Sequence, residues 1–376
     1  MARPNRFLVV VDCGGRELEA HCADPGRLEQ ILVPGCTVLV VARSGANRRT
    51  AHTLVAAEYR GHVIPLLSAA ANAAMEALVL RPRHPAARIR REYPVGRVRL
   101  DFAVEEADSQ QLIEVKACTL VEHSVALFPD APTARGLRQL HQLRQLNRLP
   151  GPGQRGSLAK ILFAVMNPEA RVLVPNLHVD PAFSAGLLAA AGEVQIEALA
   201  LRVGRDGRAD VVGDVPLDLD RVASLRPDSG CYLLTVELAE ATELQVGALG
   251  SLRLAAGYYV YVGSALRNLW QRLARHRRRR KRSHWHIDYL TLQARHVATH
   301  AVVSGARLEC HAARLVAAVA DGEVAEFGSS DCDCSSHLFF FDRPPLLSAP
   351  FRRVLARLRH HDAWLTSGQL AGAEQI

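Results

Sequence analysis

Two acidic residues and a lysine stand on neighbouring apolar segments of the chain. Residues 98–104 alternate between apolar and polar or small side chains, which predicts a half-buried strand with Asp101 facing away from the core. Residues 111–116 alternate in the same way and place Glu114 and Lys116 on one face. If these strands pair, two carboxylates and an ammonium group converge.

Two carboxylates at close range repel each other unless a cation lies between them. A hard divalent ion, Mg²⁺ or Mn²⁺, suits oxygen ligands and keeps positions open for a phosphate oxygen and a water. Lys116 would position or deprotonate that water, or stabilise a pentacoordinate phosphate. The alternative is an exposed sheet face on which Glu114 and Lys116 form a solvated pair, and the spacing does not choose between the two.

Glu92 precedes the strand that carries Asp101. If the chain turns back there as a hairpin, Glu92 adds a third acidic group to the same site. The alternative is a surface residue beside Arg90 and Arg91.

The composition limits the class of protein and its partners. A chain of 376 residues predicts two or three domains, and 49% apolar with 22% charged residues is typical of globular protein. The net charge of +8, a sequence pI near 9.3 and clustered basic residues favour a polyanionic partner, DNA or RNA.

No window approaches the roughly 18 apolar residues of a membrane span, and the first residues do not resemble an export signal. We therefore expect a cytoplasmic protein that does not enter a membrane. The eight cysteines are scattered, without the spacing of a disulfide framework.

Residues 6–67 read as short strands separated by tight turns, including a hairpin turn at Gly14-Gly15. Strands at this spacing predict a small closed barrel. The five-stranded oligonucleotide-binding (OB) type fits their number, as would other small barrels. A helix over residues 69–80 then opens a second domain.

A basic helix follows residues 128–133 and carries a stripe of leucines, with Arg135, Arg138 and Arg144 available for a phosphate backbone. No Asp or Glu occurs over residues 131–168, although a solvated helix face is the alternative. Later strands and a helix complete an alternating pattern. This pattern predicts a mixed or parallel sheet covered by helices.

These residues resemble the sugar fermentation stimulation protein family over positions 1 to about 222. The resemblance implies nucleic-acid binding, with an OB barrel before a PD-(D/E)xK nuclease-like domain. It implies that Asp101, Glu114 and Lys116 form the nuclease signature and that Glu92 is an auxiliary acid. In place of a basic residue, His and Leu after Gly136, this chain has Leu137-Arg138-Gln139-Leu140. The resemblance is carried by Phe7-Leu8, Gly15-Arg16-Glu17-Leu18, His21-Cys22, Asp101-Phe102, Ile113-Glu114-Val115-Lys116, Phe128-Pro129-Asp130-Ala131, Thr133 and Arg135-Gly136.

A polar, turn-rich linker near residues 218–228 leads into a second half with strands over residues 230–236 and 257–263. A basic stretch over residues 267–282 contains no acidic residue, which favours contact with phosphates, although a solvated or disordered run is the alternative. Its residues expected to bind nucleic acid are Arg267, Arg275, Arg278, Arg280 and Lys281.

Cys332 and Cys334, with His337 nearby, raise the question of a zinc site. The Cys-x-Cys spacing is shorter than the usual separation of zinc ligands, and no second cysteine pair is present. The sequence therefore does not favour zinc here.

Residues 230 to about 342 resemble small Uri-type domains of the GIY-YIG endonuclease superfamily. The resemblance implies that Tyr232 and Tyr261 flank the attacking water, that Arg272 stabilises charge at the phosphate, that His276 assists proton transfer and that Glu309 holds a metal ion. Residues 240–254 would loop out as an insertion. The resemblance is carried by Gly230-Cys231-Tyr232, Tyr261-Val262-Gly263-Ser264-Ala265, Arg272, Ala274-Arg275-His276, His284-Trp285-His286-Ile287-Asp288-Tyr289-Leu290, Glu309-Cys310 and Gly328-Ser329-Ser330-Asp331-Cys332.

We therefore expect an α/β and α+β multidomain chain, with an OB-like barrel over residues 1–67, a nuclease-like domain over 68–222, a small α/β domain over 228–344 and a helical tail over 345–376. The predicted function is metal-dependent hydrolysis of phosphodiester bonds, with two candidate centres. The alternative is a DNA-binding regulator of sugar metabolism whose nuclease-like folds bind without cutting. The sequence leaves open the choice between DNA and RNA, and the oligomeric state.

Overall fold

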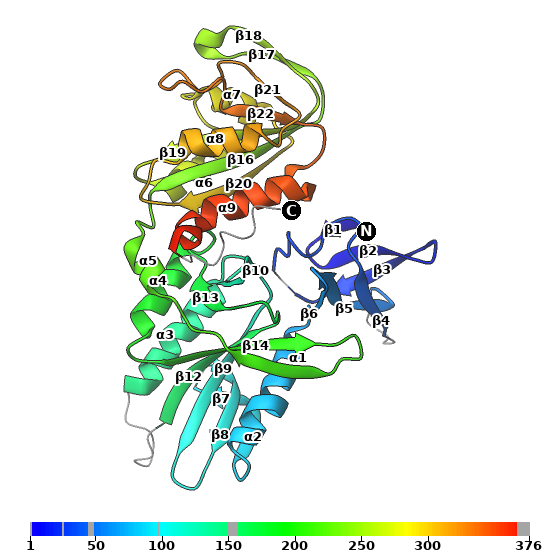
Figure 1. The fold of residues 1–376 in the computed structure, drawn as a ribbon, viewed down its shortest axis with the longest axis vertical. Helices are drawn as coiled ribbons and strands as arrows, with labels where there is room; N and C mark the ends of the chain where they lie inside the picture. The colour runs from blue at the N-terminus through cyan, green and yellow to red at the C-terminus, as the bar shows by residue number, and fades with distance from the viewer. Residues whose placement is uncertain (1, 25, 44–48, 97, 149–156, 367–376) are drawn as a thin grey trace. The chain divides into compact units, whose positions relative to one another are not determined.

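A computed structural model describes residues 2–24, 26–43, 49–96, 98–148 and 157–366. The chain forms two compact units, Met1–Ser224 and Leu225–Ile376 (Figure 1). Each unit is built around its own sheet.

The first unit begins with the predicted barrel of short strands, coloured blue in Figure 1. The hairpin between β2 and β3 turns at Gly14 and Gly15, whose φ angles of 62° and 82° suit glycine. An additional strand, β1, pairs with β2 and was not predicted. The barrel strands are β1 Ala2–Asn5, β2 Leu8–Cys13, β3 Arg16–Cys22, β4 Val38–Ala42, β5 His52–Tyr59 and β6 His62–Pro65.

A mixed sheet follows, as the alternating pattern predicts. β9, β12 and β14 run parallel, whereas β7, β8 and β9 pair antiparallel. The strands are β7 Arg88–Val95, β8 Val98–Glu105, β9 Gln110–Cys118, β12 Ser157–Val165, β14 Gln195–Val203 and β15 Ala209–Asp214; a smaller sheet holds β10 Val121–Glu122, β11 Val125–Phe128 and β13 Val172–Pro175.

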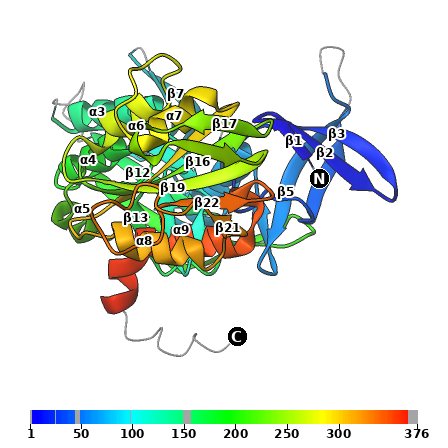
Figure 2. The same cartoon turned by 90° about the horizontal axis from the view of Figure 1, so that it is seen from above.

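Helices cover both faces of the mixed sheet. α3 and α4 lie side by side, and their buried residues share one core with that face of the sheet (Figures 1 and 2). α1 and the π-helical turn after it pack on the opposite face. Of the predicted leucine stripe, Leu140 and Leu143 are fully buried. The helices are α1 Ser68–Met75, the π-helical turn Glu76–Leu80, α2 Arg81–Arg83, α3 Ala134–Arg148, α4 Pro181–Ala190 and α5 Asp220–Ser224.

The second unit has an antiparallel sheet in the order β20-β16-β19-β22-β21. Alternate residues of β16 face opposite sides, with Cys231 and Leu233 in the core that includes α8 and α9. α6 and α7 contact β16 as well. The strands are β16 Gly230–Leu238, β19 Gly257–Ala265, β20 His296–Val303, β21 Gly322–Glu323 and β22 Leu338–Phe341, and the helices are α6 Leu269–His276, α7 His286–Gln293, α8 Glu309–Ala317 and α9 Ala349–Thr366.

The predicted insertion and the predicted tail have different places in this unit. β17 Thr242–Gln245 and β18 Ser251–Leu254 pair only with each other, so the insertion does form a separate hairpin. The tail is helical in α9, but its residues Phe351, Val354 and Leu358 are buried in the core of the unit. The part of α9 up to Leu358 is therefore packed in this unit, and residues 367–376 lie outside the described range.

No helix in the described ranges is both long enough and apolar enough to cross a membrane.

Candidate functional site

The Asp101 carboxylate lies where the pairing of β8 with β9 ends. The ladder runs as far as Phe102 and Ile113. Beyond this pair, Asp101 Oδ2 accepts a hydrogen bond from the backbone N–H of Val115 at 2.8 Å, and Asn72 Nδ2 of α1 donates to Oδ1 at 2.8 Å. The Asp101 carboxylate thus accepts the Val115 N–H in place of a backbone carbonyl of the neighbouring strand. Hydrogen bonds from β9 and from α1 fix its two oxygens.

The alternation expected for this strand is interrupted at Asp101. Phe102 and Val104 pack beneath α1, whereas Leu100 belongs to the core on the α3 face. A strict period of two would place all three on one face. The change of face is a local departure from regular strand geometry, directly at the acidic residue.

Glu114 and Lys116 form a closed network with Gln139 of α3. Lys116 Nζ lies 2.7 Å from Glu114 Oε1 and 2.7 Å from Gln139 Oε1, and Gln139 Nε2 donates to the same Glu114 oxygen. Glu114 Oε2 is buried and has no hydrogen-bond partner among the described residues. Lys116 keeps 12% of its side chain exposed, against 5% for Glu114. The predicted convergence of both residues is therefore present, but the pair is buried rather than solvated.

The electrostatics of Glu114 fit a nearby cation. Burial raises the pKa of the Glu114 carboxyl, the Asp101 charge raises it further, and the Lys116 ammonium partly offsets both. A divalent cation at the unpartnered Oε2 would satisfy that oxygen and screen the two carboxylates. The donors present thus fit Mg²⁺ or Mn²⁺.

Gln139 was not predicted as a site residue. It occupies the place, after Arg138 and before Leu140, where the family pattern has His. This position could have indicated a site residue, because an amide can hydrogen-bond to both a lysine and a carboxylate, as an imidazole can.

Glu92 is at the register position opposite Asp101, on β7, but no backbone pair forms there. Its φ of 51° is in the left-handed region. Its carboxylate lies 3.6 Å from Arg99, and both side chains are more than 60% exposed. In this structure Glu92 therefore pairs with Arg99 at the surface and does not contact Asp101, Glu114 or Lys116.

The three arginines predicted on α3 have different surroundings. Arg135 and Arg138 are exposed, and the charge of Arg135 acts on Glu114. Arg144 instead lies 2.6 Å from Glu193, which Arg148 also contacts at 2.6 Å. Arg144 and Arg148 therefore share one carboxylate, which comes from a segment after α4 that is distant in sequence, and the predicted contact of Arg144 with phosphate stays a prediction.

Arg138→Ala and Arg144→Ala should differ in their effects on nucleic-acid binding. Loss of one phosphate contact lowers the slope of log affinity against log salt by about 0.9, so we expect that change for Arg138→Ala. Arg144→Ala should leave the slope nearly unchanged, because its charge is already paired. Fluorescence anisotropy over a salt series measures both slopes, and equal slopes in the two variants would contradict the assignment.

The second unit brings together the residues expected from its resemblance. The rings of Tyr232 and Tyr261 are 6.4 Å apart on one face of the sheet. Gly263 lies opposite Tyr232, and a Cβ there would come within 2.5 Å of the Tyr232 hydroxyl, so only glycine admits the ring. Both tyrosines are buried, and burial raises the pKa of each phenol.

His276 and Arg272 of α6 lie beside this pair. His276 Nε2 is 3.1 Å from the Tyr232 hydroxyl, and burial together with nearby cations lowers the pKa of His276 to about 4. Arg272 stacks over Trp285 with its guanidinium carbon 4.8 Å from the ring centre. It also donates to the carbonyl of Ser264 at 2.6 Å.

Glu309 completes this group at the first residue of α8. It accepts a hydrogen bond from the Ser264 hydroxyl and lies 3.6 Å from His337 Nδ1. Burial would raise the pKa of Glu309, but these two partners and Arg272 outweigh it and lower the pKa. Glu309 is therefore an ionised carboxylate at neutral pH.

Arg275 and Lys281, which the sequence predicts as contacts for nucleic acid, both face a buried carboxylate in this structure. Arg275 donates two hydrogen bonds to the buried Asp288, at 3.0 and 2.9 Å, and Lys281 Nζ lies 3.4 Å from the same carboxylate. Asp288 also accepts from the backbone N–H groups of His284 and Trp285 at the start of α7. Two cations thus face one buried carboxylate.

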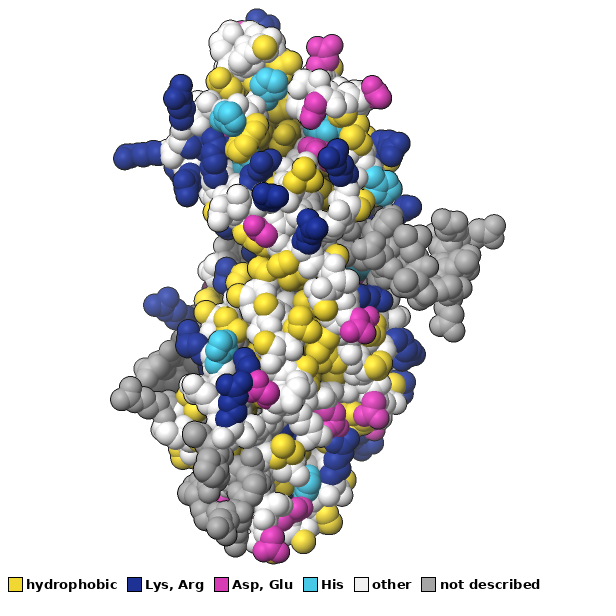
Figure 3. Space-filling view, turned by 90° about the vertical axis from the view of Figure 1, so that its left-hand side faces the viewer, with side chains coloured by type: hydrophobic (Ala, Val, Ile, Leu, Met, Phe, Trp, Pro, Cys, Tyr) yellow, Lys and Arg dark blue, Asp and Glu magenta, His cyan; other side chains and the backbone are white. Residues whose placement is uncertain are grey.

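Arg267, Arg278 and Arg280 are exposed and remain the candidates of this basic stretch. Figure 3 shows Lys and Arg side chains gathered, with His among them, on the upper part of one face, which belongs to the second unit.

Comparison with known families assigns each part of the chain. Residues 1–66 match the SfsA N-terminal OB domain, which confirms the OB barrel, and residues 66–207 match the sugar fermentation stimulation protein RE domain. Residues 231–360 match a domain of unknown function, DUF123.

Relatives cover the first unit. The sugar fermentation stimulation protein homolog of Moorella thermoacetica is 40% identical over 205 residues, which are 53% of this chain and 86% of that protein. The homolog of Methanothermobacter thermautotrophicus is 37% identical over 191 residues, 49% of this chain and 76% of that protein. A solved structure of Pyrococcus furiosus SfsA in complex with Ca²⁺ is similar, with 28% identity and a TM-score of 0.52, covering 57% of this chain and 92% of that one. The chain therefore belongs to the sugar fermentation stimulation protein family and carries a DUF123 domain after the family's own two domains.

Proposed function

We propose that this protein is a divalent-metal-dependent nuclease that hydrolyses phosphodiester bonds in DNA or RNA. The observation that carries the proposal is the buried, unpartnered Oε2 of Glu114 beside the fixed carboxylate of Asp101 and the ammonium of Lys116. Such an arrangement on a mixed sheet flanked by helices fits the PD-(D/E)xK nuclease type.

The residues of this first centre have separate roles in the proposal. Asp101 and Glu114 would hold Mg²⁺ or Mn²⁺, which polarises a phosphate oxygen and lowers the pKa of a bound water. Asn72 and the Val115 amide fix the Asp101 oxygens. Lys116, held by Gln139, supplies a positive charge for the negative charge that develops on the phosphate.

The second centre, of GIY-YIG type in this proposal, groups Tyr232, Tyr261, Arg272, His276 and Glu309. Neutral His276 can accept a hydrogen bond from the Tyr232 hydroxyl, which lies 3.1 Å from Nε2, and would orient that phenol for proton transfer. Arg272 would grip the phosphate, and Glu309 would hold a divalent metal ion.

A specific observation favours binding without cutting at the second centre. Tyr232 and Tyr261 are only 3% and 9% exposed, and burial raises the pKa of both phenols. A phenol with a raised pKa gives up its proton less readily at neutral pH. The rival function, a DNA-binding regulator that does not cleave, rests on this point.

The test is incubation of the purified chain with single- and double-stranded DNA and RNA, with and without Mg²⁺ or Mn²⁺. Glu114→Ala and Glu309→Ala are compared singly and together. We expect metal-dependent cleavage that falls in Glu114→Ala and disappears in the double variant. Binding without cleavage under either metal would instead support the regulator.

Gln139 provides a second test of the first centre, through its contacts with Glu114 and Lys116. Gln139→Leu removes both hydrogen bonds and should lower cleavage by about 10- to 100-fold, as is typical for residues that orient metal ligands. Gln139→His keeps a polar group at this position and should retain most of the activity. A steady-state cleavage assay measures both, and equal losses in the two variants would show that Gln139 serves only packing.

A further inference from the structure

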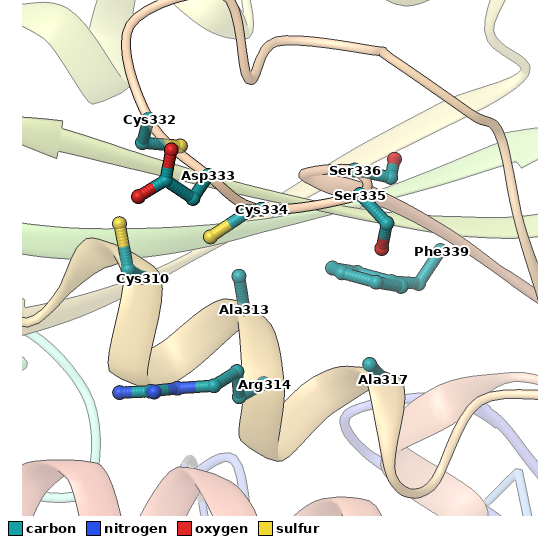
Figure 4. Close-up of a pocket in the computed structure, with 10 residues that line it drawn as sticks. All are labelled: Cys310, Ala313, Arg314, Ala317, Cys332, Asp333, Cys334, Ser335, Ser336 and Phe339. Atoms are coloured by element: carbon teal, nitrogen blue, oxygen red, sulfur yellow. The ribbon is translucent and has the colours of Figure 1, made fainter.

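A cluster of three thiols and one imidazole lies in the second unit, apart from the tyrosine pair. One ligand atom from each of Cys310, Cys332, Cys334 and His337 lies within 4.8 Å of all the others. Figure 4 shows the three cysteine side chains pointing toward one another, Cys310 from α8 and the other two from the loop that leads to β22. The sequence argument against zinc fails here, because the third cysteine comes from a different element.

We propose that Cys310, Cys332, Cys334 and His337 bind one structural Zn²⁺. Three thiolates and an imidazole are a common ligand set of closed, tetrahedral zinc sites. Sulfur ligands at about 2.3 Å from zinc lie roughly 3.8 Å apart in a tetrahedron, so small movements close this cluster around the ion. Soft thiolate ligands select zinc over the hard cations proposed for the carboxylate sites.

His337 is already arranged as a metal ligand would be. Nε2 faces the cluster, 3.4 Å from Cys332 Sγ, while Nδ1 faces Glu309 at 3.6 Å. Nδ1 is buried and has no hydrogen-bond partner among the described residues. A ligating histidine usually directs its second nitrogen at a carboxylate, which fixes the tautomer and the ring.

The surroundings explain what the ion would stabilise. The loop that holds Cys332 and Cys334 contains no helix or strand. His337 is fixed by its backbone, because its N–H donates to the Phe327 carbonyl and its carbonyl accepts from the Val262 N–H. Zinc would tie this loop to α8 at Cys310. Arg314, one turn further along α8, and the three cysteines line one pocket of about 560 Å³.

The site also bears on Glu309, which directly precedes Cys310 and faces His337. Zinc would therefore fix the carboxylate of the second centre from two directions, through the backbone of α8 and through the imidazole. The zinc site itself does not depend on nuclease activity, so its test is independent of the proposed function.

The test uses the full chain purified without chelator, with zinc measured by elemental mass spectrometry. We expect about one Zn²⁺ per chain in the wild type and in Cys13→Ser, an exposed cysteine of the first unit, and close to none in Cys310→Ser and Cys334→Ser. Substitution by Co²⁺ should produce thiolate-to-metal absorption bands in the wild type and in Cys13→Ser, but not in Cys310→Ser or Cys334→Ser.

A second measurement needs no variant and remains valid if the serine variants fail to fold. Zinc should protect Cys310, Cys332 and Cys334 of the wild type from alkylation, and a strong chelator should remove the protection while Cys13 reacts in both states. A wild-type chain that holds no zinc after reconstitution would overturn the proposal. So would a disulfide among the three cysteines in protein purified under nitrogen.

Discussion

Glu114→Gln, introduced into a chain that already carries Glu309→Gln, should lower the remaining Mg²⁺-dependent cleavage by about 100-fold or more. Residues that merely orient a metal ligand typically contribute 10- to 100-fold, and Glu114 would be a ligand itself. Glutamine keeps the shape and can still accept a hydrogen bond from Lys116, so the variant removes the charge and not the packing. Initial cleavage rates of the single and double variants give the ratio.

Binding of the metal can be followed separately from cleavage. In the Glu309→Gln background, a Mg²⁺ concentration of 100 times the dissociation constant of the first centre should add about 2.7 kcal/mol of stability, seen as a higher melting temperature. Adding Glu114→Gln to that background should abolish the gain. Glu105→Gln is the matched control, because Glu105 lies on β8 and contacts Arg90 at 3.2 Å. A metal-induced shift that persists in Glu114→Gln would contradict the assignment.

Asp288→Ala should destabilise the second unit by about 3 to 5 kcal/mol. Asp288 is fully buried, and its loss would leave the charges of Arg275 and Lys281 without their carboxylate. The two N–H groups at the start of α7 would lose their acceptor as well. For a unit of this size the melting temperature should fall by roughly 10 °C, measured by differential scanning calorimetry.

The pH dependence of stability follows from the same carboxyl group. Burial alone would raise the pKa of Asp288, but Arg275 and the backbone N–H groups outweigh it and lower the pKa to about 2. The stabilisation is therefore present above the ordinary value of 3.8 and is lost as the pH falls toward 2. Asp342→Ala, at an exposed position of the same unit, is the control. A loss below 1 kcal/mol in Asp288→Ala would show that the network is not required.

Local alternation predicts β8, β9, β16 and β19 close to their observed bounds, whereas β20, β21 and β22 of the second sheet were not predicted. The sequence also predicts that Asp101, Glu114 and Lys116 converge, since a period of two and one antiparallel pairing are enough to bring them together. What it misses at this site arises from tertiary contacts. Gln139 contacts Glu114 and Lys116 from α3. The strand alternation that predicts the two charged residues gives no information about which helix residue packs against them.

The basic stretches do not reveal ion pairs between residues that are distant in sequence. Arg144 lies within the acid-free stretch 131–168, yet in the folded chain it pairs with Glu193, as does Arg148. Arg275 and Lys281 belong to a run that is basic in sequence, but the fold directs both at Asp288. The sequence of this basic stretch does not show which of its cations face inward. Only the folded chain shows that Arg267, Arg278 and Arg280 are exposed, whereas Arg275 and Lys281 are partly buried.

The most direct measurement of the central claim is a crystal structure of the chain grown with Mn²⁺, using the anomalous scattering of the ion. We predict an anomalous peak bonded to a carboxylate oxygen of Asp101 and to Glu114 Oε2, and no such peak in Glu114→Gln. The claim would be contradicted if a chain that cleaves nucleic acid bound Mn²⁺ only at places where neither Asp101 nor Glu114 is a ligand.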